Sequence, residues 1–281
     1  MTSRPKRSLG QNFLVDPGLR RRIVEAVQVE PGETVLEIGP GRGALTEGLV
    51  EVIDEREGHL VAVELDDSLA EALKRRFDGN PRVRIIHGSV LDLSLDEVLA
   101  DPTELKVVGN IPYNLTSPIL FHLLERPRPR EILLMVQREV ADRILAPPGG
   151  GDYGALSIGV RTVAAVERVL HLGPGAFRPR PRVDSTVIRL LPFHPAPLTP
   201  GEEAGVRVLT RALFQWRRKQ LGKSFRDHPD LSFSPEAIAG ALAAAGAATT
   251  DRPEQLSPEA FIAAARSLAS DGSLTGGLGA A

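Results

Sequence analysis

Two short segments of this 281-residue chain carry residue types that could act together in one reaction. The first, Glu37 to Gly43, places three glycines at alternate positions directly after the apolar run Val35 to Ile38. Glycine permits positive φ angles and a close approach of the backbone, and a turn that opens a helix presents N–H groups to a ligand. The segment therefore predicts a site for a nucleotide-like cofactor, with Gly39 and Gly41 in contact with it.

Two residues of this turn bear on the charge of the cofactor. Pro40 has no N–H group, which removes a donor from a loop that would cradle a pyrophosphate. Glu37 adds a negative charge, which disfavours a pyrophosphate and suits a cationic sulfonium group. Glu64, at the end of the next apolar run, can accept hydrogen bonds from both ribose hydroxyls of an adenosine. A dinucleotide stays open at this point, because the turn also fits the pattern G-x-G-x-x-A through Ala44.

The second segment, Asn110-Ile111-Pro112-Tyr113, suits a flat base that carries an amino group. The amine of adenine is a poor nucleophile, because its lone pair is delocalised into the ring. The carbonyls of the Asn110 side chain and the Ile111 backbone could each accept an amine hydrogen and direct that lone pair at an electrophilic methyl group. Pro112 stiffens the turn, and Tyr113 offers a stacking face, worth about 1–3 kcal/mol per base. Phe177 is predicted to form a second aromatic wall for the base. The alternatives are that Asn110 to Tyr113 form only an ordinary turn and that Phe177 is an ordinary core residue.

Both segments follow short apolar runs that alternate with helical patterns. Runs of this kind lie at residues 35–38, 60–64, 83–86, 106–109 and 132–136. Such alternation indicates a parallel, doubly wound sheet with helices on its faces. Two later runs, 166–172 and 185–191, are joined by a loop and are expected to pair antiparallel. Residues 9–14 are polar and interrupted by a glycine, so no regular structure is predicted for them.

The proline-rich stretch 192–200 predicts a domain boundary, because the pattern beyond it is entirely helical. Ser234 and Ser257 each precede Pro-Glu-Ala, which is typical of a helix start with serine at the N-cap. We predict a catalytic domain at residues 1–196, a helical RNA-binding or ribosome-binding domain at 197–270 and a disordered tail at 271–281.

The charge distribution predicts a polyanionic partner despite a net charge of only −2. Half of the 34 Lys and Arg residues lie in residues 1–22, 175–189 and 204–226, which contain only two of the 36 acidic residues. Such segregation is the footprint of a phosphate-facing surface. The alternative is a set of solvated helix faces. The predicted RNA contacts are Arg178, Arg180, Arg217, Arg218, Lys219 and Lys223.

Composition excludes several other classes of protein. The chain has no cysteine and its six histidines are scattered, which predicts neither a disulfide nor a metal site. No apolar run reaches the roughly 18 residues of a membrane span. The basic start lacks the apolar core of a signal peptide, so a cytoplasmic protein with no membrane partner is expected.

Taken together, these segments resemble the rRNA adenine N6,N6-dimethyltransferases. The resemblance spans about residues 6–268 and is carried by Gly10–Leu14, Glu37–Gly43, Asn110–Asn114 and Phe177–Ser185. The stretch after Tyr113, from Thr116 to Leu123, and the run Trp216–Leu221 are most similar to the small-subunit branch. The resemblance implies a Rossmann-like class I methyltransferase with a seven-stranded, mostly parallel sheet, one antiparallel strand and a small all-helical C-terminal domain.

The resemblance also implies a cofactor and a substrate. The cofactor is S-adenosylmethionine, and the targets are two adjacent adenosines in the 3′-terminal hairpin loop of 16S rRNA, each methylated twice within the maturing 30S subunit by a monomeric enzyme. By motif position, Asn12 and Leu14 touch the methionine end of the cofactor, Gly39 its middle and Glu64 its ribose, and Asn110 lies between cofactor and target amine.

One position departs from the family pattern. The family usually has an acidic residue where this chain has Ser89, which can still hydrogen-bond the adenine amine, although without charge. Asp92, three residues later, is the alternative contact.

Three other functions stay open from the sequence. An antibiotic-resistance type of large-subunit rRNA adenine methyltransferase shares both motifs. A non-catalytic ribosome assembly factor could share the fold, although a pure binder needs neither the glycine turn nor the Asn110 segment. A nicotinamide-dependent oxidoreductase rests on the glycine turn alone.

Overall fold

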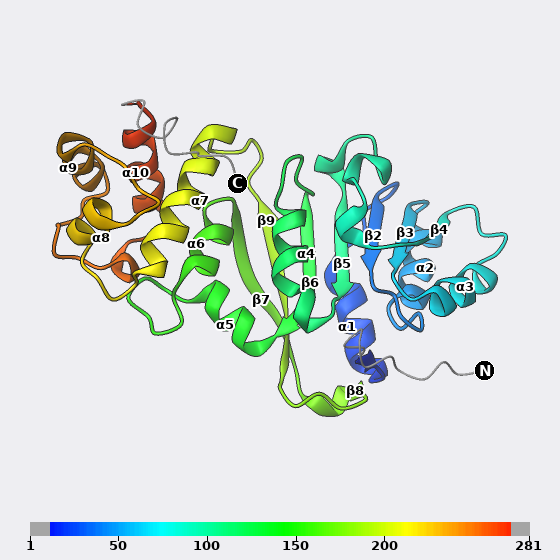
Figure 1. Ribbon diagram of the computed structural model, residues 1–281. Coiled ribbons are helices and arrows are strands. Elements are labelled where there is room, and N and C mark those ends of the chain that lie inside the picture. Colours follow the sequence, from blue (N-terminus) through cyan, green and yellow to red (C-terminus); the bar gives the residue numbers. More distant parts are fainter. Residues whose placement is uncertain (1–11, 271–281) are drawn as a thin grey trace. The chain divides into compact units, whose positions relative to one another are not determined.

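The structure, a computed structural model, describes residues 12–270 (Figure 1). The basic residues before Asn12 and the predicted disordered tail lie outside this range. The described strands are β1 (Phe13–Leu14), β2 (Thr34–Ile38), β3 (His59–Glu64), β4 (Val83–His87), β5 (Lys106–Asn110), β6 (Glu131–Gln137), β7 (Ala164–Leu172), β8 (Phe177–Arg178) and β9 (Ser185–Pro192). The described α-helices are α1 (Pro17–Val27), α2 (Thr46–Glu55), α3 (Asp67–Arg76), α4 (Thr116–Leu123), α5 (Arg138–Leu145), α6 (Ala155–Arg161), α7 (Pro200–Gln215), α8 (Leu221–Asp227), α9 (Pro235–Ala244) and α10 (Pro258–Ser270).

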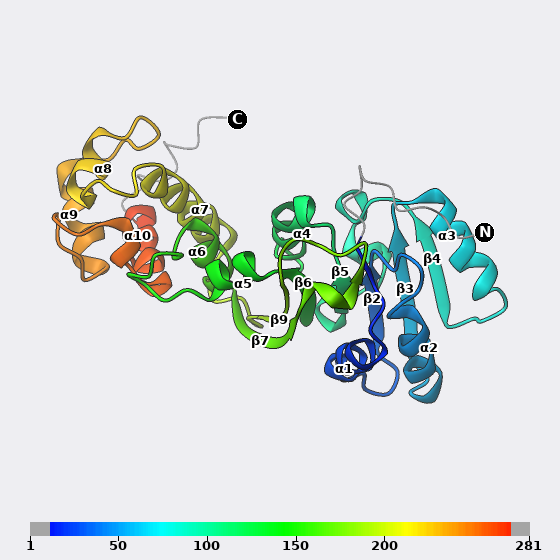
Figure 2. The same ribbon diagram turned by 90° about the horizontal axis from the view of Figure 1, so that it is seen from below.

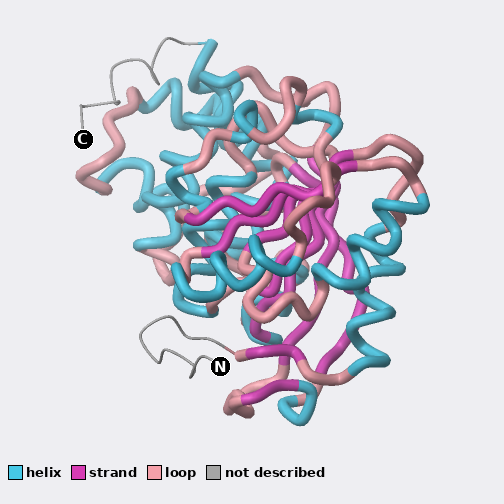
Figure 3. The backbone as a smooth tube through the Cα atoms, turned by 90° about the vertical axis from the view of Figure 1, so that its right-hand side faces the viewer, coloured by secondary structure: helices cyan, strands magenta, loops and turns pink. Residues whose placement is uncertain are grey.

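The predicted sheet is confirmed. Seven strands lie in the order β4-β3-β2-β5-β6-β9-β7, and they form one layer, drawn in magenta in Figure 3. Strands β4, β3, β2, β5 and β6 pair in parallel, and β9 pairs antiparallel to β6. Every residue of β2 is buried, as expected for a parallel strand covered on both faces. In a sheet of this kind, loops at the carboxyl ends of neighbouring strands meet, which brings the ends of β2, β3 and β5 together.

Helices cover both faces of the sheet. Figure 2 shows α1 and α2 together on one face and α4 on the other. Helix α1 begins at Asp16-Pro17, a sequence typical of a helix start with aspartate at the N-cap and proline in the first turn, and the Asp16 Oδ1 atom accepts the Leu19 N–H at 2.9 Å. Its buried side chains Ile23, Val24 and Val27 belong to the same core as the α2 side of the sheet. The core thus ties the N-terminal residues before α1 to the strands that carry the site.

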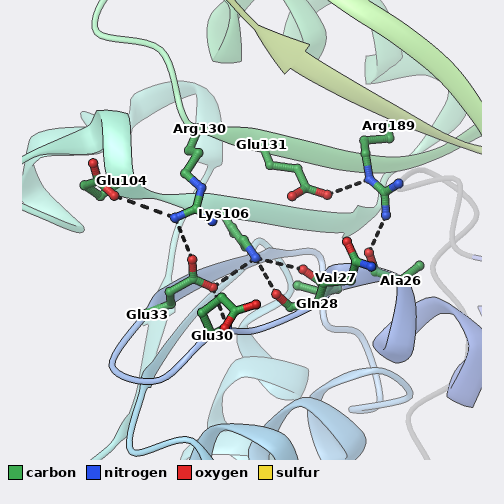
Figure 4. A network of polar contacts seen from close by, with 10 residues as sticks. All are labelled: Ala26, Val27, Gln28, Glu30, Glu33, Glu104, Lys106, Arg130, Glu131 and Arg189. Carbon is green, nitrogen blue, oxygen red and sulfur yellow. Dashed lines mark hydrogen bonds and ion pairs between the residues drawn. The ribbon is translucent and has the colours of Figure 1, made fainter. Parts of the chain in front are cut away.

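A charged network lies at the opposite end of the sheet, where strands β5 and β6 begin (Figure 4). The ammonium group of Lys106, buried at the start of β5, pairs with Glu33 Oε2 at 2.9 Å. It also donates to the carbonyls of Val27, at 3.2 Å, and Gln28, at 2.5 Å, at the end of α1. Arg130 reaches the second Glu33 oxygen at 2.8 Å. A buried charge is tolerated only with such partners, so this network fixes the end of α1 to the sheet.

The prediction of irregular structure through residue 14 is wrong. Phe13 and Leu14 form β1, which pairs antiparallel with Arg178 and Phe177 of β8. A two-residue strand has no periodicity to recognise, and its stability comes from a partner more than 160 residues away. We call residues Asn12–Leu14 the strap.

The described chain packs into two compact units. The first contains the strap, most of the sheet and α1 to α4. The second contains residues 142–165 together with residues from Phe193 onward. Its core joins α6 to α7 and α10, with the hydroxyl of Tyr153 donating to the Leu256 carbonyl at 2.7 Å. The packing therefore groups 142–165 with the C-terminal helices, whereas the sequence alone places them before the predicted boundary at residue 196. Ser234 accepts the Ala237 N–H at the start of α9, as predicted for an N-cap.

Candidate active site

The glycine turn connects β2 to α2 and needs glycine for two reasons. Gly39, Gly41 and Gly43 have φ angles of +64°, +60° and +84°, which L side chains rarely adopt. A Cβ atom on Gly41 would lie 3.2 Å from the Phe13 ring, and one on Gly39 would lie 3.4 Å from the Asn110 carbonyl oxygen. The turn is therefore packed between the strap and the end of β5.

Glu64 holds this turn in place. Its Oε2 atom accepts the Gly41 N–H at 2.8 Å, and its Oε1 atom accepts the Asp66 N–H, also at 2.8 Å. Burial raises the pKa of the Glu64 carboxyl, while the two N–H groups act in the opposite direction. Each carboxylate oxygen can accept a further hydrogen bond, so the carboxylate can both brace the glycine turn and accept ribose hydroxyls.

Glu37 is the most unusual group of the site. Its side chain is 1% exposed in the middle of the sheet, and its Oε2 atom has no hydrogen-bond partner in the described chain. Burial, with a smaller contribution from the charge of Glu64, raises the pKa of Glu37 to about 8, against the lowering influence of Thr46. A buried, unpaired carboxylate is costly, and a cation in the adjoining pocket would offset that cost.

Asn110 lies at the end of β5, and a hydrogen bond to the strap fixes the orientation of its side-chain amide. Its Nδ2 atom donates to the backbone carbonyl of Asn12, in the strap, at 3.1 Å. A carbonyl can pair only with the amide nitrogen, so this bond leaves the Asn110 Oδ1 atom as the acceptor for a ligand. That Asn110 accepts an amine hydrogen stays a prediction.

Ile111, Pro112 and Tyr113 continue from β5. Ile111 is buried, and Tyr113 begins a short 3₁₀ turn, Tyr113–Leu115. The Tyr113 hydroxyl shares a 2.7 Å hydrogen bond with the hydroxyl of Ser185. Burial raises the pKa of Tyr113 against the opposing influence of that bond, so the ring stays neutral at physiological pH.

Of the two predicted adenine contacts, Ser89 lies at the pocket and Asp92 does not. Ser89 lines the pocket, and its Oγ atom accepts the Leu91 N–H at 3.1 Å as the cap of the 3₁₀ turn Val90–Asp92. The Ser89 hydroxyl keeps a second lone pair, which can accept a hydrogen bond from an amine, as well as its own hydrogen. Asp92 is exposed and does not line the pocket.

A single pocket in the first unit brings most of the predicted residues together. It is lined by every predicted cofactor residue and by every predicted catalytic residue except Phe177. Its empty volume, including the open space at the mouth, is about 990 Å³. Phe177 is fully buried in β8, paired with Leu14, and packs in the core. In this structure Phe177 supports the strap and does not face the pocket.

Two site residues were not singled out from the sequence. Phe13 lines the pocket, packs on Gly41 and carries the Arg42 guanidinium 4.4 Å from its ring centroid. Ser185 lies behind Tyr113. Both belong to segments that carry the family resemblance, but neither has a local pattern that reveals its partner.

The predicted RNA contacts divide into two groups, one in each unit. Arg178 and Arg180 are exposed in the first unit. In the second, Arg218, Lys219 and Lys223 are exposed. Arg217 differs, because its guanidinium pairs with Glu254 at 2.6 Å and donates to the Gly151 carbonyl at 2.9 Å. Arg217 is thus committed to holding the second unit together.

Among residues 12–270, no three or more His, Asp or Glu side chains gather in a way that could hold a metal ion. In the same part of the chain, no helix is long and apolar enough to cross a membrane.

Comparisons with known proteins show which family this chain resembles. A family model described as "Ribosomal RNA adenine dimethylase" matches residues 2–253. "Ribosomal RNA small subunit methyltransferase A" of Pseudomonas putida is 40% identical over 267 residues, which cover 95% of this chain and 96% of that protein. The protein of the same name from Acidobacterium capsulatum is 42% identical over 269 residues, covering 95% and 93%.

Two solved structures are similar over nearly the whole chain. A dimethyladenosine transferase from Plasmodium falciparum has a TM-score of 0.79 and 24% identity, covering 93% of this chain and 98% of that one, and it supports the fold. The 23S rRNA methyltransferase ErmE has a TM-score of 0.69 and 26% identity, covering 92% and 100%.

Proposed function

This chain belongs to the ribosomal RNA adenine dimethylase family, and we propose that its substrates are two adjacent adenosines in the 3′-terminal hairpin loop of 16S rRNA. Each N6 amine receives two methyl groups, late in the assembly of the 30S subunit. The choice of the small subunit is supported by relatives about 40% identical along 95% of the chain.

The cofactor is S-adenosylmethionine, which supplies an electrophilic methyl group on a positively charged sulfur when bound. The residues of the pocket fit it. Glu37, which lines the pocket and has one buried oxygen without a partner in the described chain, suits a cation, and the positive-φ glycines leave room that side chains would fill. In our proposal Asn12 and Leu14 hold the methionine end, Gly39 and Gly41 the middle and Glu64 the ribose. Ser89 hydrogen-bonds the adenine.

The observation that carries the proposal is the orientation of the Asn110 amide. The Asn110 Nδ2 atom donates to the Asn12 carbonyl, so the Asn110 Oδ1 atom remains to accept one hydrogen of the target amine. The backbone carbonyl of Ile111 accepts the other, and the two acceptors localise the lone pair on N6. Pro112 fixes the turn and Tyr113 stacks on the base. Catalysis is positioning and electrostatics, and the N6 proton leaves after transfer, so no general base is required.

A stacked or paired base cannot reach such a pocket, so the target adenosine must be splayed out of its loop. The half-buried position of Tyr113 in the lining of the pocket and the full burial of Phe177 support Tyr113 as the aromatic residue that meets the base. Phe177 contributes in our proposal by supporting the strap.

The partner is proposed to be the assembling 30S particle, with a monomeric enzyme acting in the cytoplasm. Residues Arg178 and Arg180 of the first unit, and Arg218, Lys219 and Lys223 of the second, are exposed cations suited to phosphates. A hairpin loop is a small target for cations on two units, which supports a particle as the substrate.

The test is methyl transfer from labelled S-adenosylmethionine to small and large subunits isolated from cells that lack these methyl groups, followed by mapping of the labelled nucleotides. We expect label on two adjacent adenosines near the 3′ end of 16S rRNA. Label confined to the large-subunit RNA would favour an activity like that named for ErmE. Binding to small subunits without transfer would favour a non-catalytic assembly factor.

A further inference from the structure

Ser185 occupies a fixed point beside the pocket. It is the first residue of β9, is fully buried and lies opposite Gln137 in the β6–β9 ladder. The preceding residue, Asp184, is held from two directions by Arg138. The Arg138 N–H donates to the Asp184 carbonyl at 3.0 Å, and the Arg138 guanidinium pairs with the Asp184 carboxylate at 2.9 Å. The Ser185 hydroxyl is therefore presented by a firmly held strand end.

Tyr113 is held less firmly. It lies in a single 3₁₀ turn after β5, and its half-buried ring lines the pocket. Its hydroxyl shares a 2.7 Å hydrogen bond with Ser185 Oγ, which lies 72 residues further along the sequence. A tyrosine ring pivots about its Cβ atom, so a hydrogen bond at the far end fixes the tilt of the ring.

We propose that Ser185 is a positioning residue, whose hydroxyl holds the Tyr113 ring in the orientation that receives the target base. This inference rests on the proposed function. Stacking requires a defined ring plane, and a ring that is ordered before the base arrives loses less conformational freedom on binding. Without the bond the ring samples other tilts, and part of the binding energy of the base is spent on reordering it.

The position of Ser185 also connects the base to the phosphates. The exposed Arg178 and Arg180 lie on the segment that leads into Ser185. RNA bound to Arg178 and Arg180 would contact the segment that continues into Ser185, the residue that orients Tyr113. One segment would then carry both the cations for the phosphates and the residue that orients the stacking face.

The test is a double-mutant cycle of Ser185→Ala, Tyr113→Phe and the double variant, assayed for methyl transfer to undermethylated small subunits. Each single variant should lower kcat/KM by about tenfold, as expected for one hydrogen bond that acts on the bound base. The double variant should be no worse than either single one, because both changes remove the same bond. Additive losses, or activity equal to the unmodified protein, would overturn the proposal.

Thr186→Val is the matched control. Thr186 is the next residue, equally buried, and its hydroxyl has no hydrogen-bond partner in the described chain. Loss of this hydroxyl should leave kcat/KM unchanged. A tenfold loss in Thr186→Val would mean that the strand tolerates no change and that Ser185 has no specific role.

A second readout needs no activity. The chain contains two tyrosines, Tyr113 and Tyr153, so 3-fluorotyrosine labelling gives two ¹⁹F signals. The Tyr113 signal, assigned by its loss in Tyr113→Phe, should sharpen and shift towards the solvent value in Ser185→Ala, while the Tyr153 signal stays in place. An unmoved Tyr113 signal would refute the positioning role even if the proposed substrate were wrong. Failure of the unmodified protein to methylate small subunits would instead refute the proposed function.

Discussion

The Asn110 amide nitrogen donates to the strap, and its oxygen is proposed to accept a hydrogen of the target amine. Asn110→Ala removes both, so we expect methyl transfer to fall by at least about a hundredfold, as when one preorganised polar group is deleted from other active sites. Affinity for S-adenosylmethionine should fall only a few-fold, because the glycine turn and Glu64 remain. Single-turnover rates and calorimetric binding separate the two effects. Near-normal turnover would remove Asn110 from the mechanism.

Glu37 makes stability depend on pH. The folded protein holds its proton up to a pH of about 8, whereas the unfolded chain loses it near the ordinary pKa of 4.5. Between these values the unfolded chain is ionised and the folded protein is not, so the free energy of unfolding falls as the pH rises, by up to about 1.4 kcal/mol per pH unit. Glu37→Gln should flatten this slope in urea unfolding between pH 5.5 and 7.5.

Glu71→Gln is the control for this measurement. Glu71 pairs with Arg75 on the surface, so its substitution should leave the dependence of unfolding free energy on pH unchanged. Cofactor binding gives an independent check. Affinity for S-adenosylmethionine should increase with pH towards 8, as Glu37 ionises beside the sulfonium, whereas S-adenosylhomocysteine, which lacks that charge, should show little dependence. An identical pH slope in Glu37→Gln and the unmodified protein would contradict the assignment.

At the scale of elements, the strap completes the site. It is held by β8, by the Val15 N–H on the Ala176 carbonyl at 2.8 Å, and by the Arg20 guanidinium on the Leu14 carbonyl at 2.9 and 3.2 Å. Without these anchors the Asn12 carbonyl would not be in place to orient Asn110. The Lys106 network (Figure 4) serves the same end by fixing the far end of α1, which follows the strap.

Arg20→Ala tests this element. It should weaken binding of S-adenosylmethionine by about tenfold, roughly the contribution of a charge-assisted hydrogen bond at a half-exposed position. The melting temperature should change little, because the buried core side chains of α1 are retained. Arg21→Ala, at the exposed neighbouring position, should bind the cofactor normally. Equal affinities for the two variants would show that the strap does not depend on Arg20.

At the scale of the whole molecule, the number of Lys and Arg residues in the three basic segments overstates how many of them can contact RNA. Several of the basic residues in the clustered segments are used internally: Arg189 pairs with Glu131 at 2.7 Å, Arg217 pairs with Glu254 at 2.6 Å, and Arg20 donates to the Leu14 carbonyl at 2.9 and 3.2 Å. Arg218, Lys219 and Lys223 are exposed in the second unit and are the better candidates for phosphate contacts.

Substituting Arg218 and Lys219 with glutamine should therefore weaken binding to small subunits and lower the slope of log affinity against log salt by about 1.5, the loss of two phosphate contacts. Arg217→Gln is the matched control. It should lower the melting temperature, since Glu254 and the Gly151 carbonyl lose their partner, and leave the salt slope unchanged. An unchanged slope in the double variant would mean that this run is only a solvated face.

The sequence by itself determined the parallel sheet, the helix starts at Asp16 and Ser234, and the position of the glycine turn and Asn110 at strand ends. These features depend on neighbouring residues: buried apolar runs, capping side chains and backbone freedom at glycine. Because parallel strands end at a common edge, local patterns were enough to place the cofactor and substrate residues together.

Only the tertiary structure decided which distant groups pair. The Asn12–Asn110 and Tyr113–Ser185 bonds span 98 and 72 residues, Phe177 proved to be a buried support, and Arg217 is bound to Glu254. A hydroxyl, an amide or a guanidinium can pair with many partners, and local sequence carries no preference among them. The choice is made by the packing of the sheet and helices, which brings one partner within reach and buries the others.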